Sequence, residues 1–280
     1  MMFEMKTAGL TDTGRTRTNN EDTFLIDDSL LIVADGMGGA AAGEVASSLA
    51  VNVIKRYMKD ISYTSDKRIT QHFEMAILKA DSEIKKLTKE KPELSGMGTT
   101  IMSALHINER LLLGYVGDSR AYLITPVSNV RASKKGNEPK IDMNAETAVL
   151  KKIDDDYKPS EKKSIRRMTS DHSVVMDLVN SGVINEDEIR THPLRNRITR
   201  CVGNLVGPGP DFIWHNITDG DTVILCSDGL WEMIYDDLIL AIISSSTEPK
   251  EICKRLIDAA NNAGGVDNIT VIAAQFKKKN

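Results

Sequence analysis

The sequence has few cysteines and aromatic residues, and it has no long hydrophobic run. Its 280 residues include three cysteines, Cys201, Cys226 and Cys253, whose scattered positions lack the spacing of a disulfide framework or a zinc site. We expect reduced thiols and a cytoplasmic protein, with Cys226 packed inside a strand. No stretch approaches the roughly 18 consecutive apolar residues of a membrane span, and the N-terminal residues contain no apolar core of an export signal. The sequence therefore predicts neither export nor contact with a membrane.

An excess of positive charge is also missing. The formal net charge is -4 and the isoelectric point is near 5.8, so the chain lacks the basic surplus that binding to nucleic acid requires. With 41% hydrophobic and 27% charged residues, the composition is that of a folded globular chain. We expect one domain over residues 1–280, and a monomer.

Hydrophobic periodicity predicts both strands and helices. Short runs rich in Val, Ile and Leu predict strands at 23–26, 30–34, 99–105, 110–116, 121–124, 222–226 and 269–274. Helical spacing of apolar residues predicts one helix over about 42–59, with Val45, Leu49, Val53 and Ile54 on one face, a second from Ile69 to Leu87, and a third after Pro249. Because the first two helices follow one another directly, the pattern favours an α+β fold of sheets covered by paired helices over a doubly wound parallel sheet.

One segment, residues 126–166, is unusually charged. It contains ten basic and seven acidic residues, including "DDD" at 154–156. We interpret it as a solvated insertion with a short strand such as "TAVL" at 147–150. A role in binding a partner is the alternative.

Acidic residues follow or precede several of the predicted strands. Aspartate is a poor strand residue, and burying its charge costs several kcal/mol unless something compensates. Yet "LLIVA" runs into an Asp-Gly pair, and "VILCS" does so again. The acidic residues at strand ends are Asp35, Asp118, Asp228 and Asp267, together with the Glu21 and Asp22 pair before the first strand. Any one of them could be a turn residue, since Asp-Gly is a common turn pair. The glycines Gly36 and Gly229 would allow a positive φ or a close approach of the backbone.

If these strand ends lie side by side, the carboxylates need cations among them. Two unit charges about 4 Å apart repel by about 4 kcal/mol at an effective dielectric constant near 20. Ligands that are all oxygen select a hard ion, Mg²⁺ or Mn²⁺ or else Ca²⁺, over zinc. The spacing differs from that of the 12-residue calcium loop. We therefore predict a two-metal hydrolytic centre fed by distant strands.

A phosphate-binding group lies nearby in the sequence. Arg17 stands four residues before Glu21, and a guanidinium can grip phosphate oxygens with two hydrogen bonds. Arg15 is the competing candidate on the same segment.

Eight blocks of the sequence resemble the metal-dependent protein phosphatases of the protein phosphatase 2C family, and in particular its bacterial branch. In order they are "TDTGRTRTNNED", "LLIVADGMGGAAAGEVAS", "GMGTT", "GYVGDSRAYLI", "MTSDHSVV", "THPLRNRITRCVG", "VILCSDGLWEMI" and "GGVDNIT". They extend from about residue 7 to 275. The resemblance implies a four-layer α/β/β/α sandwich in which two antiparallel sheets are flanked by helix pairs.

The resemblance also implies roles for the acidic residues. Asp35 would bridge two Mn²⁺ or Mg²⁺ ions, the Gly36 carbonyl would help to hold one, and Asp228 and Asp267 would hold the other. Asp118 would bind a third, weaker ion shared with Asp228. Of Glu21 and Asp22, one would contact a metal or its water and the other would lie behind it, in an order that the resemblance leaves open.

The implied reaction is hydrolysis of phosphoserine and phosphothreonine in proteins, opposing a Ser/Thr kinase. A water activated by the ions would attack phosphorus, with Arg17 rather than Arg15 on the phosphate and Asn268 orienting its neighbours. Other branches of the family place a histidine after the Asp-Gly pair as the proton donor, but this chain has Met37. We prefer a metal-bound water as the donor, and we interpret His172 as structural.

Residues 173–200 resemble the flap beside the active site. Their Arg190, Arg195 and Arg197 are candidates for contacting the phosphoprotein. Two alternatives remain at this point: a pseudophosphatase that binds phosphoproteins without turnover, and a phosphatase of sigma-factor regulators.

Overall fold

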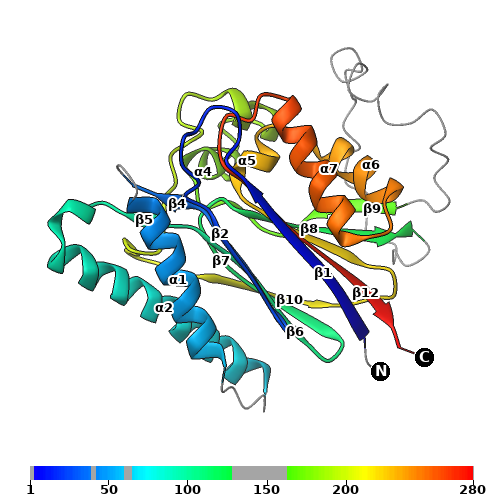
Figure 1. Cartoon of the computed structure of the whole chain (residues 1–280), viewed down its shortest axis with the longest axis horizontal. Coiled ribbons are helices and arrows are strands. Elements are labelled where there is room, and N and C mark those ends of the chain that lie inside the picture. Colours follow the sequence, from blue (N-terminus) through cyan, green and yellow to red (C-terminus); the bar gives the residue numbers. More distant parts are fainter. Residues whose placement is uncertain (1–2, 39–41, 60–64, 128–162, 280) are drawn as a thin grey trace.

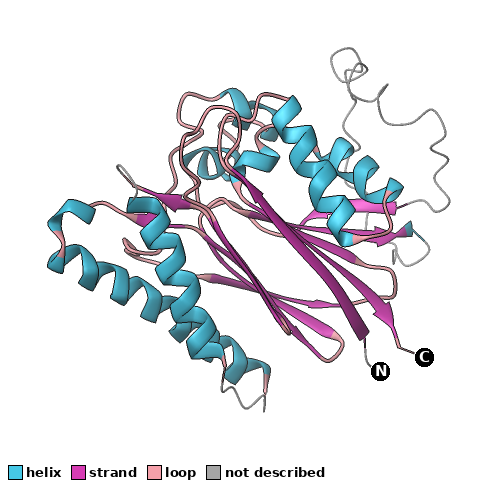
Figure 2. Ribbon diagram, viewed as in Figure 1, coloured by secondary structure: helices cyan, strands magenta, loops and turns pink. Residues whose placement is uncertain are grey.

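The computed structural model describes residues 3–38, 42–59, 65–127 and 163–279. Two five-stranded antiparallel sheets form its centre (Figures 1 and 2). The first sheet has the order β1 (Phe3–Asp12), β12 (Ile269–Lys278), β11 (Thr222–Cys226), β8 (Arg120–Pro126) and β9 (Lys163–Arg167). The second has the order β10 (Asp211–Asn216), β7 (Arg110–Val116), β6 (Ile101–Ile107), β3 (Leu30–Ala34) and β2 (Thr23–Asp27). A two-stranded ribbon pairs β4 (Gly36–Met37) with β5 (Gly98–Thr99).

Helices cover the outer face of each sheet, so the predicted α/β/β/α sandwich is confirmed. The second sheet is covered by α1 (Ala42–Met58) and α2 (Asp66–Glu90), which leads into the short η1 (Pro92–Leu94). The first sheet is covered by α6 (Asp236–Ser245) and α7 (Pro249–Asn262). The shorter α4 (Val174–Asn180), η3 (Glu186–Thr191) and α5 (Asp228–Trp231) lie in the connections.

Three apolar cores lie between these four layers. The core between the sheets contains the inward-facing residues of both, among them Leu31, Val33, Leu113, Leu225 and Ile272. Alternate residues of the same strands, such as Ile32 and Ile224, point outward to the helices. Both faces of the central strands are therefore buried, which explains why "LLIVA" and "TVILC" are continuously apolar instead of alternating.

The predicted helices are confirmed, except that one residue expected in the core of α1 is exposed. In α2, Ile69, Phe73 and Ile77 are buried as expected. In α1, however, Val45 is 36% exposed, and the buried stripe is formed by Ala42, Ala46, Ala50, Val53, Ile54 and Met58. The small alanines let α1 approach the sheet and the β4–β5 ribbon closely. No helix of the described residues is long and apolar enough to cross a membrane.

The ends of the charged segment belong to the sheet, which corrects the predicted insertion boundaries of 126–166. Pro126 is the last residue of β8, and Lys163–Arg167 form the edge strand β9, paired with β8 from Tyr122 to Pro126. The strand β9 was predicted to be part of the charged insertion because it is rich in lysine and arginine. Edge strands tolerate these residues, which discourage pairing with a further strand. Residues 128–162, including the predicted strand at 147–150, lie outside the described residues.

Candidate active site

The strand register brings the predicted acidic residues to one end of the sandwich. Asp12, the last residue of β1, pairs with Ile269, the first of β12, and Cys226 at the end of β11 pairs with Arg120 at the start of β8. In the other sheet, Thr23 pairs with Ala34. Within two residues of these pairs are five aspartates, each from a different connection: Asp22, Asp35, Asp118, Asp228 and Asp267. This end of the sandwich is the one away from the chain termini (Figure 1).

Asp35 lies at the electrostatic centre of this group. Burial raises the pKa of its carboxyl well above the usual range, and the charges of Asp22, Asp228, Asp118 and Asp267 raise it further, in that order. Burial also raises the pKa of Asp228 well above normal, and the charges of Asp118 and Asp267 raise it further. Aspartates from distant strand ends therefore influence one another's charge at this end of the sandwich.

Two of the buried carboxylates have an oxygen without a partner. Asp22 accepts a hydrogen bond from Ser227 Oγ at 2.8 Å on Oδ2, but its Oδ1 has no partner within the described structure. Asp228 Oδ1 is also buried without a partner there. Burial raises the pKa of Asp22 to about 7 and that of Asp118 to about 7. Buried, unpaired oxygens among like charges fit a hard divalent cation.

The carboxylates do not form a finished metal cage. Among the described residues, no three His, Cys, Asp or Glu side chains are placed so that they could together hold one metal ion. Asp267 already has a partner, because its Oδ2 accepts a hydrogen bond from Arg17 Nη2 at 2.7 Å. Since this ion pair is about half exposed on the Arg17 side, the two side chains can separate at little cost.

Arg17, and not Arg15, is directed at the acidic residues. The charges of Asp267, Asp228 and Glu21 all act on its guanidinium. Arg15 makes its described hydrogen bond through the backbone, from its N–H to the carbonyl of Gly265 at 2.7 Å. The geometry therefore agrees with the choice that the resemblance suggested.

Glu21 and Asp22 occupy different depths of the site. Asp22 is 8% exposed and reaches the buried carboxylates, while Glu21 is only partly buried and lies near Arg17 and Asp267. Burial raises the pKa of Glu21, and the nearby Arg17 opposes that shift. Their order, which the sequence left open, is thus Asp22 inside and Glu21 toward the surface.

The glycines after the aspartates serve close packing, not positive φ. A Cβ on Gly36 would lie 2.2 Å from the Gly43 carbonyl oxygen and 2.5 Å from that of Glu21. A Cβ on Gly229 would lie 2.1 Å from the Asn268 carbonyl oxygen. Of the two readings of these glycines, close approach is the one observed, and the partner is the backbone of a neighbouring acidic segment.

Asn268 fastens the loop that carries Arg17 and Glu21 to the start of β12. Its Nδ2 donates to the carbonyls of Thr13 and Asn19 at 3.0 and 2.8 Å, and its Oδ1 accepts from the Glu21 N–H at 2.8 Å. This is the orienting role expected for Asn268. One amide side chain thereby fixes the loop at three backbone points.

Threonines of the β5–β6 region hold the backbone of Asp35. The Asp35 carbonyl accepts from Thr99 Oγ1 and from the Thr100 N–H, both at 2.8 Å, and the Asp35 N–H donates to Thr100 Oγ1 at 3.0 Å. Thr100 Oγ1 also lies 2.7 Å from the hydroxyl of Ser119, beside Asp118. The block "GMGTT" therefore links two of the acidic residues.

His172 is structural, as expected. Its Nδ1 accepts from the Gly117 N–H at 3.1 Å, so Nε2 carries the proton and donates to Asp211 at 3.0 Å. Burial lowers the pKa of His172, which keeps the ring neutral. With both nitrogens engaged, the ring is not free to protonate a leaving group.

Only part of the expected arginine set is available to a substrate. Arg190 is committed to the protein, because its Nη2 donates to the Ile234 carbonyl at 3.0 Å and its guanidinium stacks 3.9 Å from the Tyr235 ring centroid. The suggestion that Arg190 contacts the phosphoprotein is therefore not supported. Arg197 is exposed, whereas burial raises the pKa of Glu232 and the charge of the nearby Arg195 opposes that rise.

Sequence reasoning missed Glu232 and Ser227. Burial raises the pKa of Glu232, whose charge in turn acts on Asp118 and Asp228. Its signal was present, since Glu232 lies one helical turn after Asp228 and must point to the same side. Ser227 had no signal beyond its place in "CSDG", because a single serine at a strand end is ordinary.

Comparison with known proteins places this geometry in a family. The model of the Protein phosphatase 2C family matches residues 12–269. Protein phosphatase PhpP of Streptococcus pneumoniae is 30% identical over 280 residues, covering 98% of this chain and 99% of its own. The crystal structure of the Mycobacterium tuberculosis serine/threonine phosphatase PstP/Ppp has a TM-score of 0.78 and 31% identity, covering 98% of this chain and 99% of that one. The structure of the PstP catalytic domain in complex with two manganese ions has a TM-score of 0.77 and 30% identity, covering 99% and 100%.

Proposed function

This chain belongs to the protein phosphatase 2C family, and we propose that it removes phosphate from phosphoserine and phosphothreonine in proteins with the help of two Mn²⁺ or Mg²⁺ ions. The observation that carries the proposal is the buried aspartate cluster around Asp35, whose mutual repulsion a divalent cation would relieve. The two manganese ions in the similar PstP catalytic domain support the same reading. When bound, such ions supply the charge that lets water lose a proton near neutral pH and that offsets the phosphoryl charge.

Each acidic residue takes a role that its position supports. Asp35, with neighbouring carboxyls on several sides, would contact both ions, and the Gly36 carbonyl would contact one of them. Asp228 and Asp267 would hold the second ion, and Asp118 would share a third, weaker one with Asp228. The acidic set is completed by Asp22, which accepts a hydrogen bond from Ser227, and by Glu21, which lies beside Arg17.

Arg17 would change partners during the reaction. In this structure it neutralises Asp267 at 2.7 Å. If Asp267 held an ion, the guanidinium would be free to bind phosphate oxygens through two parallel hydrogen bonds. The same side chain can thereby shield the site before loading and hold the substrate afterwards.

The proton for the leaving serine or threonine oxygen comes, in this proposal, from water. Met37 has no proton to give, and His172 is held by Gly117 and Asp211. The chain thus contributes orientation and charge to this step.

The expected partners are phosphorylated proteins and the Ser/Thr kinase that phosphorylates them. We propose a monomer acting in the cytoplasm as a single domain, with residues 173–200 as a substrate-facing flap. The exposed Arg197 supports a contact with acidic phosphoproteins, while the buried Val175 and Met176 attach the same segment to the core.

Phosphate release from a phosphothreonine peptide tests the proposal. We expect activity in Mn²⁺, its loss on adding a chelator, and a fall of at least about 100-fold for Asp35→Asn. Asp27→Asn is the matched control, because Asp27 lies at the other end of β2 and, among the described residues, forms its ion pair with Lys55 at the surface, at 3.2 Å. Activity that survives the chelator would refute the metal-dependent mechanism. Manganese binding measured by calorimetry without any turnover would favour the pseudophosphatase instead. A preference for sigma-factor regulators among phosphorylated substrates would favour a phosphatase of those regulators.

A further inference from the structure

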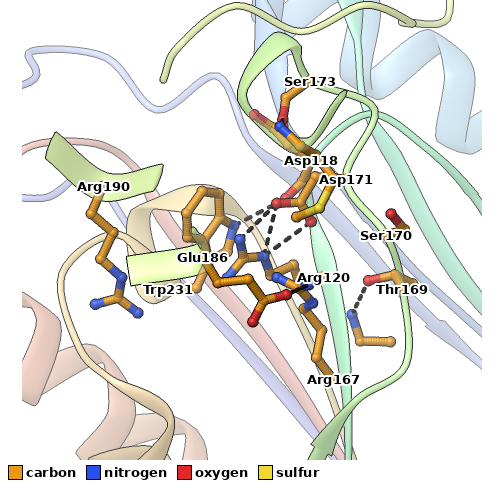
Figure 3. A network of polar contacts seen from close by, with 12 residues as sticks. Asp118, Arg120, Arg167, Thr169, Ser170, Asp171, Ser173, Glu186, Arg190 and Trp231 are labelled. Carbon is orange, nitrogen blue, oxygen red and sulfur yellow. Dashed lines mark hydrogen bonds and ion pairs between the residues drawn. The ribbon is translucent and has the colours of Figure 1, made fainter. Parts of the chain in front are cut away.

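A buried ion pair stands directly behind Asp118. Arg120 Nη2 donates to Asp171 Oδ2 at 2.6 Å and Nε donates to Oδ1 at 3.0 Å, with both residues at most 5% exposed. Figure 3 shows Asp171 beside Asp118, and the charge of Asp171 is the largest electrostatic influence on the Asp118 carboxyl. Arg120 therefore neutralises a charge that would otherwise repel Asp118.

The same arginine is stacked on Trp231. Its guanidinium lies 3.5 Å from the centroid of the indole ring, within the range of a cation–π contact. The indole Nε1 donates to the backbone carbonyl of Asp118 at 3.0 Å (Figure 3). Asp171, Arg120, Trp231 and the Asp118 backbone thus form one continuous chain of contacts.

Trp231 also belongs to the helix that begins at Asp228. The four-residue α5 carries Asp228 at its first position and Trp231 at its last. One rigid turn therefore positions the Asp228 carboxylate and, through the indole, the Asp118 backbone. A displacement of either residue would be passed to the other.

The turn before Asp118 is also held by hydrogen bonds from His172. His172, which follows Asp171, donates its N–H to the Gly117 carbonyl at 2.9 Å and accepts from the Gly117 N–H on Nδ1 at 3.1 Å. Gly117 has φ of +104°, and a Cβ there would lie 2.6 Å from Thr100 Cγ2. The turn is therefore fixed from both sides.

Stability alone does not account for this arrangement. A buried ion pair is often no better for stability than apolar residues of the same volume, so its presence needs another reason. We propose that Arg120, Asp171 and Trp231 are positioning residues that fix Asp118 next to Asp228 for the third, weaker divalent ion. This inference rests on the proposed function but concerns only the third ion and not the pair at Asp35.

The chain contains a matched control for Trp231. Its only other tryptophan, Trp214, also has an arginine over its ring, Arg110 at 4.5 Å, and its Nε1 also donates a hydrogen bond, to Thr70 at 3.1 Å. Trp214 lies in β10 and packs with the α1–α2 side of the fold, away from Asp118. Replacing each tryptophan by phenylalanine removes the same kind of hydrogen bond at two different places.

Manganese titration of the purified full chain by calorimetry is the first test. We expect Trp231→Phe to weaken only the weakest Mn²⁺ binding step, by about five-fold for one lost hydrogen bond, and Trp214→Phe to change no step. Arg120→Lys keeps the positive charge but loses the two-point grip on Asp171, so we expect a loss of about ten-fold in the same step. It also provides the test if Trp231→Phe does not fold. Asp118→Asn should abolish that step.

Tryptophan fluorescence gives a readout that does not require turnover. In the Trp214→Phe background Trp231 is the only tryptophan, and we expect its emission to change at the Mn²⁺ concentration of the weakest step. The change should disappear in Trp214→Phe/Asp118→Asn. A Trp231→Phe protein that binds all ions like Trp214→Phe, or an emission change unaffected by Asp118→Asn, would overturn the inference while leaving phosphate release by the wild-type protein intact. Absence of Mn²⁺-dependent phosphate release in the wild-type protein would instead refute the proposed function.

Discussion

Replacing Asp35 by asparagine is expected to stabilise the metal-free protein while it abolishes activity. Asp35 is half-buried, and burial together with the charges of four other aspartates raises its pKa. In the folded metal-free state these carboxyls hold protons more tightly than in the unfolded chain. The free energy of unfolding should therefore fall as the pH rises from about 4 to about 7, the interval between the ordinary carboxyl pKa and the pKa of about 7 for Asp22 and Asp118.

The size of this effect follows from the neighbouring carboxyl Asp22. Its pKa rises from 3.8 to about 7, and about three pKa units correspond to about 4 kcal/mol once the pH exceeds the folded value. Because the carboxyls share this loss of stability, removing the charge of Asp35 should restore about half of it, about 2 kcal/mol of unfolding free energy. For a chain of 280 residues that is an increase in the melting temperature of about 3–4 °C.

Thermal unfolding in chelator at pH 8 and at pH 5 measures the effect. Asp35→Asn should melt higher than the wild-type protein at pH 8, the two should converge toward pH 5, and Mn²⁺ should raise the melting temperature of the wild-type protein more than that of the variant. Asp27→Asn, which breaks only a surface pair with Lys55, should stay within about 0.5 kcal/mol of wild type in all conditions. If Asp35→Asn melted lower than wild type in chelator at pH 8, the idea that repulsion among these carboxyls requires a cation would be wrong.

Three further substitutions separate packing from chemistry. Gly36→Ala would place a Cβ 2.2 Å from a backbone oxygen and should lower the melting temperature by at least about 5 °C. Gly209→Ala is the control, because the nearest atom to its Cβ would lie at 3.6 Å, and it should leave the melting temperature unchanged. Equal melting temperatures of the two variants would contradict this. Arg17→Lys should lower kcat/KM for a phosphopeptide about ten-fold and Arg15→Lys should not; a larger effect of Arg15→Lys would reverse the assignment of the phosphate ligand. Phe73→Ala, in the fully buried core under α2, should cost about 3–5 kcal/mol in unfolding free energy with little change in kcat of the folded protein, which urea unfolding and peptide kinetics would check.

Local pattern was sufficient for most of the secondary structure. The helix from Asp66 to Glu90 and the strands through Leu30–Ala34 and Thr222–Cys226 were predictable, because helical spacing and continuous apolar runs report directly on which faces are buried. The edge strand Lys163–Arg167 was not, because an edge strand is held by pairing with its neighbour and needs no apolar signature.

The face of a helix was less predictable than its extent. Val45 was expected in the core of α1, but it is 36% exposed, and the small Ala42, Ala46 and Ala50 are buried together with Val53 and Ile54. Hydrophobicity alone cannot report the distance between two layers. That distance is set by packing across the whole interface.

The sequence by itself determined which residues carry charge at strand ends, and the composition of the set already indicated a hard cation and phosphate chemistry. Only the tertiary structure decided that Asp22 lies inside and Glu21 outside, that Arg17 is paired with Asp267, and that Arg190 is bound to Ile234 and Tyr235. The physical reason is that the chemical nature of a side chain is local, whereas its burial and its partners depend on distant segments, such as the 250 residues that separate Arg17 from Asp267. Strand register brings those segments together, and no single segment encodes it.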